Sequence, residues 1–300
     1  MNPVIKGYLQ LTRPANLPTA AADILAGIAI SGFFLTTNLG ETLDWSAFIE
    51  VVILVCSTVF LYAAGVVLND VFDYRLDQKE RPERPIPSGL VSLKSAAIFG
   101  GSLMALGFLA AFWIGLTTGV VALSLGLSIL LYDALGKHHA FFGPLNMGLC
   151  RGLNLLLGIS ILGDLTHWEY AIIPIVYIAA ITLISRGEVH GDNKKHILLA
   201  ALLYAIVVTT MTIILLYSDQ NILVSLPFVF LFAVLIFRPL LKAYKKNSPH
   251  NIKMAVKAGV ISIIVLDAVF AVGFSYWWVG AITLLLLPIS ILLSKLFAVT

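Results

Sequence analysis

Charged residues are scarce in this chain. Asp, Glu, Lys and Arg make up 12% of its 300 residues, whereas hydrophobic residues make up 59%. Soluble proteins carry about 25% charged residues, so the composition excludes an ordinary soluble globular domain. Apolar runs of roughly 20 residues recur along the whole length, and each is long enough to cross a bilayer as a helix.

Cysteine is scarce as well. The two cysteines, Cys56 and Cys150, lie inside apolar runs, so the sequence predicts neither a disulfide framework nor a zinc site. The first residues lack the apolar core and small-residue cleavage site of a removed signal peptide. Domain linkers and low-complexity tracts are missing too. We therefore expect residues 1–300 to form a single integral-membrane domain.

The hydrophobic pattern predicts an all-α, polytopic membrane bundle with nine to ten transmembrane helices. Nine spans would result if the last apolar run lay on the membrane or re-entered it. The ten expected spans are 17–36, 46–70, 92–114, 117–134, 141–161, 168–186, 197–217, 221–240, 254–274 and 277–295.

Lys and Arg are absent from every second loop between these spans. The loops that would face outward hold six acidic residues and no basic one, whereas every Lys and Arg except Arg151 lies in or beside the other loops and the two termini. Cytoplasmic loops of membrane proteins carry such an excess of basic residues. The sequence therefore predicts a multi-pass protein of the plasma (inner) membrane, with both termini and the acidic motifs cytoplasmic.

The stretch NDVFDYRLDQKERPERPIPSG, residues 69–89, follows a long apolar run. Asp70, Asp73 and Asp77 are spaced i, i+3 and i+7, which places them on one face of a helix. Clustered carboxylates repel one another unless a cation lies among them. Mg²⁺ prefers such oxygen ligands and often bridges them to substrate phosphates. The spacing therefore predicts a Mg²⁺ site, and the alternative is a solvated helix with mixed charges.

Arginines follow the acidic cluster. Arg81 and Arg84 come within a few residues of Asp77, and prolines then end the helix. Guanidinium groups bind phosphate oxygens in bidentate fashion. A metal site and phosphate-binding arginines at the end of a hydrophobic helix bundle suggest a substrate with two parts. One part is a diphosphate head, and the other is a hydrocarbon tail.

These residues resemble the first aspartate-rich motif of the UbiA superfamily of intramembrane prenyltransferases. The motif reads Asn69-Asp70-x-x-Asp73-x-x-x-Asp77, followed by Arg-Pro-x-Arg-Pro-Ile-Pro-Ser-Gly. Two further elements are similar to family signatures: Arg13-Pro14 with Asn16 and Gly27, and Tyr132 with Lys137. The stretch at 143–158, together with the extra C-terminal span, looks like the eboC-type branch, which is linked to secondary metabolism.

The second acidic motif of the family is Asp-x-x-x-Asp, at the end of the sixth helix. Here SRGEVHGDNKK places Glu188 and Asp192 at the two acidic positions. The spacing of four would let them share a helical face. The resemblance implies that they hold a second Mg²⁺, and the alternative is a polar helix end beside basic residues.

Four polar residues fall inside apolar spans: Asp23, Arg151, Asn154 and Asp267. Such residues are costly in hydrocarbon and are expected to face the bundle interior or a partner. Arg151 is expected either to reach a substrate phosphate or to pair with Asp23 as a structural ion pair. Asp267 is expected to be a structural hydrogen-bond partner.

The resemblance implies Mg²⁺-dependent transfer of a prenyl group from a polyprenyl diphosphate to an aromatic or lipid acceptor. The alternative is a non-catalytic membrane protein that binds or transports a hydrophobic metabolite. The expected partners are the diphosphate, a hydrophobic acceptor and membrane lipids, and no nucleic acid. The implied catalytic and metal-binding residues are Asp70, Asp73, Asp77, Glu188 and Asp192. The implied substrate-binding residues are Asn16, Asn69, Arg81, Arg84, Tyr132, Lys137, Arg151 and Asn154.

Overall fold

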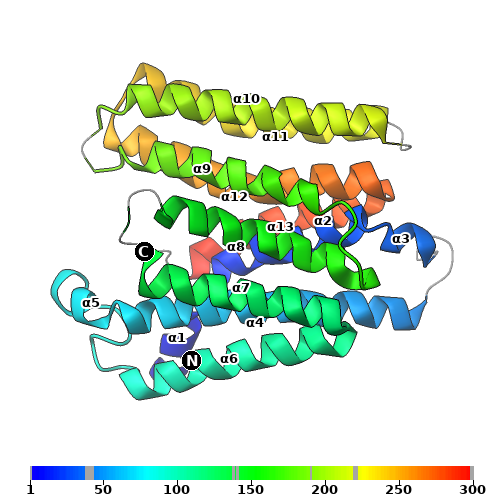
Figure 1. Ribbon diagram of the computed structural model, residues 1–300. Helices are drawn as coiled ribbons and strands as arrows, with labels where there is room; N and C mark the ends of the chain where they lie inside the picture. Colours follow the sequence, from blue (N-terminus) through cyan, green and yellow to red (C-terminus); the bar gives the residue numbers. More distant parts are fainter. Residues whose placement is uncertain are drawn as a thin grey trace.

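The fold is a bundle of long antiparallel helices (Figure 1). The computed structural model describes residues 2–37, 44–136, 139, 142–189, 191–218 and 222–297, and this part of the chain is helical with no strand. Nine of its helical segments are long and apolar enough to cross a membrane. They contain α4 (Trp45–Phe72), α6 (Leu93–Ile114), α7 (Leu116–Ala134), α8 (Phe142–Ile159) with η3 (Ser160–Leu162), η4 (Trp168–Ala171) with α9 (Ile172–Ser185), α10 (Lys194–Tyr217), α11 (Ile222–Lys245), α12 (Pro249–Phe274) and α13 (Trp277–Leu296).

The first of the ten expected spans is broken. Residues 17–36 form α2 (Leu17–Ile30) and a single turn, α3 (Phe33–Thr36), because Gly32 adopts a left-handed backbone with φ of 80° between them. The 14 residues of α2 extend only about 21 Å at 1.5 Å per residue. The other nine expected spans each coincide with one of the long segments.

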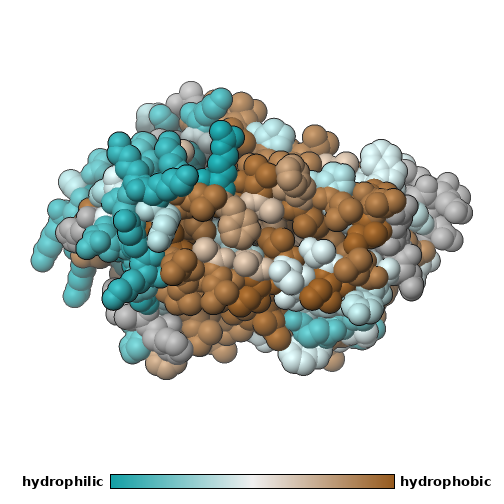
Figure 2. Space-filling view, turned by 90° about the horizontal axis from the view of Figure 1, so that it is seen from above, coloured by the Kyte–Doolittle hydropathy of each residue, from teal (hydrophilic) through white to brown (hydrophobic). Residues whose placement is uncertain are grey.

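The connections alternate between the two ends of the bundle. The short helix α5 (Tyr74–Glu80) lies at one end, together with the last turns of α7, α9 and α11 and the first turns of α8, α10 and α12, and α3 and the α6–α7 turn lie at the other end (Figure 1). Figure 2 shows hydrophilic side chains gathered at the first end and hydrophobic side chains along the body of the bundle. This arrangement is that of an integral multi-pass membrane protein, with its basic loops on one side.

The interior is organised around α12 and the short α2. Helix α12 is the most buried of the nine candidate spans, and it packs against α2, α9, α11 and α13. Helix α2 also packs closely on α8, because a Cβ on Gly27 would lie 2.3 Å from the Leu155 carbonyl oxygen and 2.7 Å from the Gly158 Cα. Small residues permit such backbone contact between membrane helices. The contact brings the polar residues of α2 and α8 together in the bundle centre.

Candidate active site

The acidic motif lies at the hydrophilic end, where α4 gives way to α5. Helix α4 ends at Phe72 and α5 begins at Tyr74, so the expectation of one continuous helix through Asp70, Asp73 and Asp77 is wrong. Asp73 lies at the break, with φ −84° and ψ 1°. The side chains of Asp70 and Asp77 are nevertheless both buried, with 8% and 2% exposed.

Arginines hold the two buried carboxylates together. Arg84 Nη1 donates a 2.8 Å hydrogen bond to Asp77 Oδ2 and a 3.3 Å hydrogen bond to Asp70 Oδ1. Arg81 Nη1 lies farther away, 3.8 Å from Asp77 Oδ1. Because one guanidinium contacts both carboxylates, their mutual repulsion is offset. The structure brings Arg84 and Arg81 to the aspartates, which the sequence analysis did not predict, and the binding of phosphate by these arginines stays a prediction.

Arg13 reaches the motif from the N-terminal segment. Its Nη2 donates a 2.6 Å hydrogen bond to Asp70 Oδ1. Arg13 lies between α1 (Pro3–Leu11) and η1 (Pro14–Asn16) and adopts a left-handed backbone, with φ of 46°. Asn16 ends η1; its backbone oxygen accepts from the Thr19 hydroxyl, and it is not among the residues that line the cavity described next.

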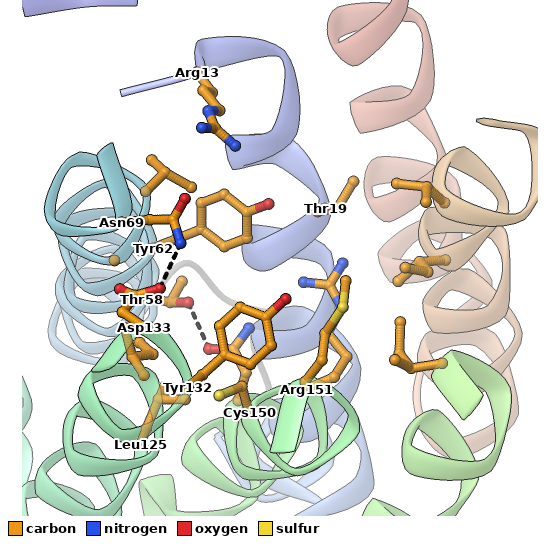
Figure 3. Close-up of a pocket in the computed structure, with 18 residues that line it drawn as sticks. Arg13, Thr19, Thr58, Tyr62, Asn69, Leu125, Tyr132, Asp133, Cys150 and Arg151 are labelled. Carbon is orange, nitrogen blue, oxygen red and sulfur yellow. Dashed lines mark hydrogen bonds between the residues drawn. The ribbon is translucent and has the colours of Figure 1, made fainter. Parts of the chain in front are cut away.

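A cavity of about 310 Å³ leads from this motif into the bundle (Figure 3). One face each of α4, α7 and α8 forms most of its wall. The rest of the lining is Arg13, Thr19 of α2, Ile178 of α9, and Val260 and Ile263 of α12. Arg13 and Asn69 place its mouth beside Asp70. The lining residues of the three main walls are Thr58, Tyr62, Gly65, Val66 and Asn69 from α4; Leu125, Ile129, Tyr132 and Asp133 from α7; and Met147, Cys150, Arg151 and Asn154 from α8.

Asp133 is a lining residue that sequence reasoning missed. It is buried, and its Oδ1 accepts a 2.8 Å hydrogen bond from Asn69 Nδ2. The expected residues Asn69 and Tyr132 also line the cavity, whereas Lys137 lies outside the described residues. Its position in the sequence could have revealed it, because Asp133 lies at the end of an expected span, on the same side of the bundle as the acidic motif.

The inner part of the cavity is polar on one side. Arg151 Nη1 lies 3.0 Å from Asp23 Oδ2, so the pairing that the sequence offered for Arg151 is confirmed. Asn154 Nδ2 donates to the same Asp23 oxygen at 2.8 Å, and Thr58 Oγ1 donates to Asn154 Oδ1 at 2.5 Å. Thr58 is a second residue that the sequence did not reveal, since threonine is common in apolar spans.

The second acidic motif departs from the expected helix. Helix α9 ends at Ser185, so Glu188 lies in a turn, and Asp192 has a left-handed backbone with φ of 51°. The expectation that both share a helical face is therefore wrong. Burial raises the pKa of the half-buried Glu188 carboxyl, and the charge of Lys253 opposes this shift. Neither acidic residue is among those that line the cavity.

The described residues contain no group of three or more Asp, Glu, His or Cys side chains arranged to hold a metal by themselves. Oxygen donors are nevertheless paired at Asp70 and Asp77, which contact one guanidinium nitrogen. Mg²⁺ is commonly held by one or two carboxylates, with waters and substrate phosphates completing its coordination. The donor set therefore fits Mg²⁺ bound together with a phosphate ligand.

A family model and several curated sequences match large parts of the chain. The model of the UbiA prenyltransferase family matches residues 25–257. A digeranylgeranylglyceryl phosphate synthase from Methanosarcina barkeri is 36% identical over 165 residues, which cover 54% of this chain and 57% of that protein. One from Methanothermobacter thermautotrophicus is 32% identical over 164 residues, with coverage of 55% and 52%. The matched stretch thus spans little more than half of these relatives, and neither supports the eboC-type branch.

Solved structures share the fold. A structure described for digeranylgeranylglyceryl phosphate synthase superposes with a TM-score of 0.67 at 22% identity, covering 90% of this chain and 98% of the other. A UbiA homologue from Archaeoglobus fulgidus, bound to GPP and Mg²⁺, gives a TM-score of 0.61 at 15% identity, with coverage of 88% and 99%. The bundle described above is therefore the fold of these proteins.

Proposed function

Because the chain belongs to the UbiA prenyltransferase family, we propose that it transfers a prenyl group from a prenyl diphosphate to an acceptor within the membrane. The observation that carries this proposal is that a largely apolar cavity opens beside the charged pair of Arg13 and Asp70. A hydrocarbon tail fits the cavity wall of Leu125, Ile129 and Ile263, and a diphosphate fits the mouth. A ligand with both parts is a prenyl diphosphate.

The proposed cofactor is Mg²⁺, and Asp70, Asp73 and Asp77 would hold it. The bound ion supplies charge neutralisation of the departing diphosphate. Glu188 and Asp192 are proposed to serve a second ion. The Archaeoglobus homologue, whose structure was solved with GPP and Mg²⁺, supports this assignment by analogy of fold.

The residues of this chain have separate tasks in the proposed reaction. Arg13 and Arg84 already contact the acidic motif, and their guanidinium groups bind and orient the diphosphate oxygens. The lining of the cavity excludes water from the allylic cation that forms when the C–O bond breaks. The aromatic rings of Tyr62 and Tyr132 line the cavity and offer cation–π stabilisation.

The acceptor is proposed to be a lipid or an aromatic compound. The relatives named digeranylgeranylglyceryl phosphate synthase favour a lipid acceptor. The new bond forms between the first prenyl carbon and a nucleophilic atom of the acceptor, which gives up a proton, while diphosphate leaves. Only a prenyl diphosphate and an acceptor are consumed.

The protein is proposed to lie in the plasma (inner) membrane with both termini and the acidic motif cytoplasmic. The basic residues at one end of the bundle support this orientation (Figure 2). Reporter fusions at the C-terminus test it. A fusion active in the cytoplasm is expected, and a fusion active only on the outer face would contradict the orientation.

The decisive experiment is mass spectrometry of the purified protein incubated with Mg²⁺, prenyl diphosphates of different lengths and a panel of lipid and aromatic acceptors. We expect a product that has the combined mass of an acceptor and one prenyl group, and we expect Asp70→Asn to abolish it. Tight Mg²⁺-dependent binding without product for any acceptor would overturn transfer and favour a carrier.

A further inference from the structure

A polar patch lies within the cavity, away from the acidic motif. We call Thr58, Arg151 and Asn154 the Arg151 wall; all three line the cavity, and Asp23 lies behind them. The three wall residues come from two helices, α4 and α8, and Asp23 comes from α2. Ionisable side chains are expensive at this depth in a membrane, and they commonly mark a functional site.

The guanidinium of Arg151 has N–H groups that donate to no residue of the described part of the chain. Its side chain is 10% exposed and lines the cavity, and Nη1 contacts Asp23. Nε is fully buried, whereas Nη2 is not among the fully buried atoms and makes no hydrogen bond to the described residues, so Nη2 is the nitrogen open to the cavity. Figure 3 shows Arg151 among the sticks that surround the cavity. A ligand oxygen in the cavity can accept a hydrogen bond from such an open guanidinium nitrogen. The wall is therefore built to receive an oxygen from within the cavity.

The charges around Arg151 decide which kind of oxygen it receives. Nη1 already pairs with Asp23 at 3.0 Å, and a second carboxyl group, Asp267 of α12, interacts with both Asp23 and Arg151. One guanidinium therefore faces two carboxyl groups, and the cluster has no surplus of positive charge. An anion would be repelled, whereas a hydroxyl or carbonyl oxygen accepts a hydrogen bond without adding charge.

The wall is distant from the place where the diphosphate is proposed to bind. Thr58 and Asn69 line the same face of α4 and are eleven residues apart, which corresponds to about 16 Å of helix at 1.5 Å per residue. A group held at the wall is thus not the diphosphate, nor the atom that attacks the first prenyl carbon near the mouth.

We propose that the Arg151 wall is a specificity site that binds a neutral oxygen, hydroxyl or carbonyl, carried by the acceptor at a distance from its nucleophilic atom. This inference rests on the proposed prenyl transfer, because it concerns the acceptor of that reaction. It predicts that the protein prefers acceptors with a second, neutral oxygen function over purely hydrocarbon ones and over anionic ones.

The test uses three rigid probes of similar size: 9-fluorenone with a neutral carbonyl, fluorene without oxygen, and 9-fluorenecarboxylate with an anion. Binding to the full-length protein in nanodiscs is measured without prenyl diphosphate. We expect fluorenone to bind roughly 3- to 10-fold more tightly than fluorene, as one hydrogen bond allows, and the carboxylate to bind most weakly. Equal affinity for fluorenone and fluorene, or tightest binding of the carboxylate, would overturn the proposal.

Two variants locate the effect. Arg151→Met combined with Asp23→Asn removes both partners of the ion pair and leaves Asp267 as the one carboxyl of the cluster, which is uncharged when protonated. This double variant should abolish the preference for fluorenone. Thr58→Val is nearly isosteric and keeps the ion pair; it should reduce the preference about threefold, and it decides the matter if the double variant does not fold. Leu127→Ala, on the exposed face of α7 and outside the cavity, should leave the preference unchanged.

The probe assay is independent of prenyl transfer. If the protein transfers prenyl groups but does not prefer fluorenone, the assignment of the wall is wrong and the proposed function stands. If fluorenone is preferred but no acceptor is prenylated, the proposed function is wrong, and the wall remains a binding site for a neutral oxygen compound.

Discussion

Arg13 and Asp70 are 57 positions apart in the chain, yet Arg13 Nη2 donates a 2.6 Å hydrogen bond to Asp70 Oδ1. The N-terminal segment is thereby held over the acidic motif, at the mouth of the cavity. Arg84 Nη1 lies 3.3 Å from the same oxygen. Asp70 thus joins two arginines that no local sequence pattern links.

Replacing Arg13 with Ala should weaken binding of geranyl diphosphate in the presence of Mg²⁺ by 10-fold or more, because a charge-assisted hydrogen bond contributes about 1.5–3 kcal/mol. Equilibrium binding to the purified protein measures this. Lys6→Ala is the control, since Lys6 is exposed on α1. Equal affinities for both variants would show that Arg13 does not contact the diphosphate.

Asp73→Asn keeps the size of the side chain but removes its charge. If Asp73 holds Mg²⁺ with Asp70 and Asp77, diphosphate binding should lose most of its Mg²⁺ dependence. Binding isotherms with and without Mg²⁺ measure this, with Glu80→Gln on the exposed face of α5 as the control. A Mg²⁺ dependence that matches the parent would remove Asp73 from the metal site.

Glu188 tests the second metal site. Glu188→Asp should keep part of the activity, because the residue lies in a turn that accommodates a shift of one methylene. Glu188→Gln should lower the rate roughly 10²–10³-fold, because a neutral amide is a poor Mg²⁺ ligand. Rates of prenyl transfer are compared beside the parent. A Gln variant as active as the parent would mean that the second site is not built on Glu188.

Gly27 should not tolerate a side chain. A Cβ there would lie 2.3 Å from the Leu155 carbonyl oxygen, so Gly27→Ala must separate α2 from α8 and should destabilise the fold by about 1–3 kcal/mol or more. Gly101→Ala is the matched control, because a Cβ there would meet no described atom within 4 Å apart from its chain neighbours and the backbone of its own helix. Thermal unfolding in detergent measures both, and the control should be as stable as the parent or slightly more so.

The cap of α4 should make stability depend on pH. The Asp44 carboxylate accepts hydrogen bonds from the Ser46 hydroxyl and from the backbone N–H groups of Ala47 and Ser46, and these lower its pKa. A lowered pKa means that the folded state favours the charged form, so the stabilisation is present above the unfolded pKa and is lost as pH falls through the folded one.

Asp44→Ala should accordingly unfold at a lower temperature than the parent at pH 7. The difference should shrink as the pH falls below the Asp44 pKa. Asp44→Asn, which still caps the helix, serves as the control and should lie close to the parent. An Ala variant with an unchanged unfolding midpoint at pH 7 would show that the cap does not contribute.

The sequence predicted the membrane spans well because their hydrophobicity is a strong local property. Long apolar runs outweigh every other local preference, so the nine long spans were found. The break at Gly32 was missed because a single glycine hardly alters the hydropathy of residues 17–36. The break at Asp73 was missed for a related reason, since the spacing of Asp70 and Asp77 suits a continuous helix.

The site was predicted only in part, because its contacts join distant segments. The grouping of Asp70 with Asp77 follows from local spacing, whereas the hydrogen bond from Asn69 to Asp133 depends on how α4 and α7 pack. Thr58 lies near Asn154 only because α4 and α8 both border the cavity. Such contacts leave no periodic trace in one sequence.

The position of Asp23 on the short α2 has a consequence for biosynthesis. A ribosome delivers α2 to the membrane long before α8, because Asn154 follows Asp23 by 131 residues. At about 5–20 residues per second, that interval lasts roughly 7–26 s. During it, the Asp23 carboxyl has neither Arg151 nor Asn154 beside it, and α2 alone is too short to cross the bilayer comfortably. The ion pair and hydrogen bond of Asp23 therefore form only after α8 has been made, so the centre of the bundle is completed late in synthesis.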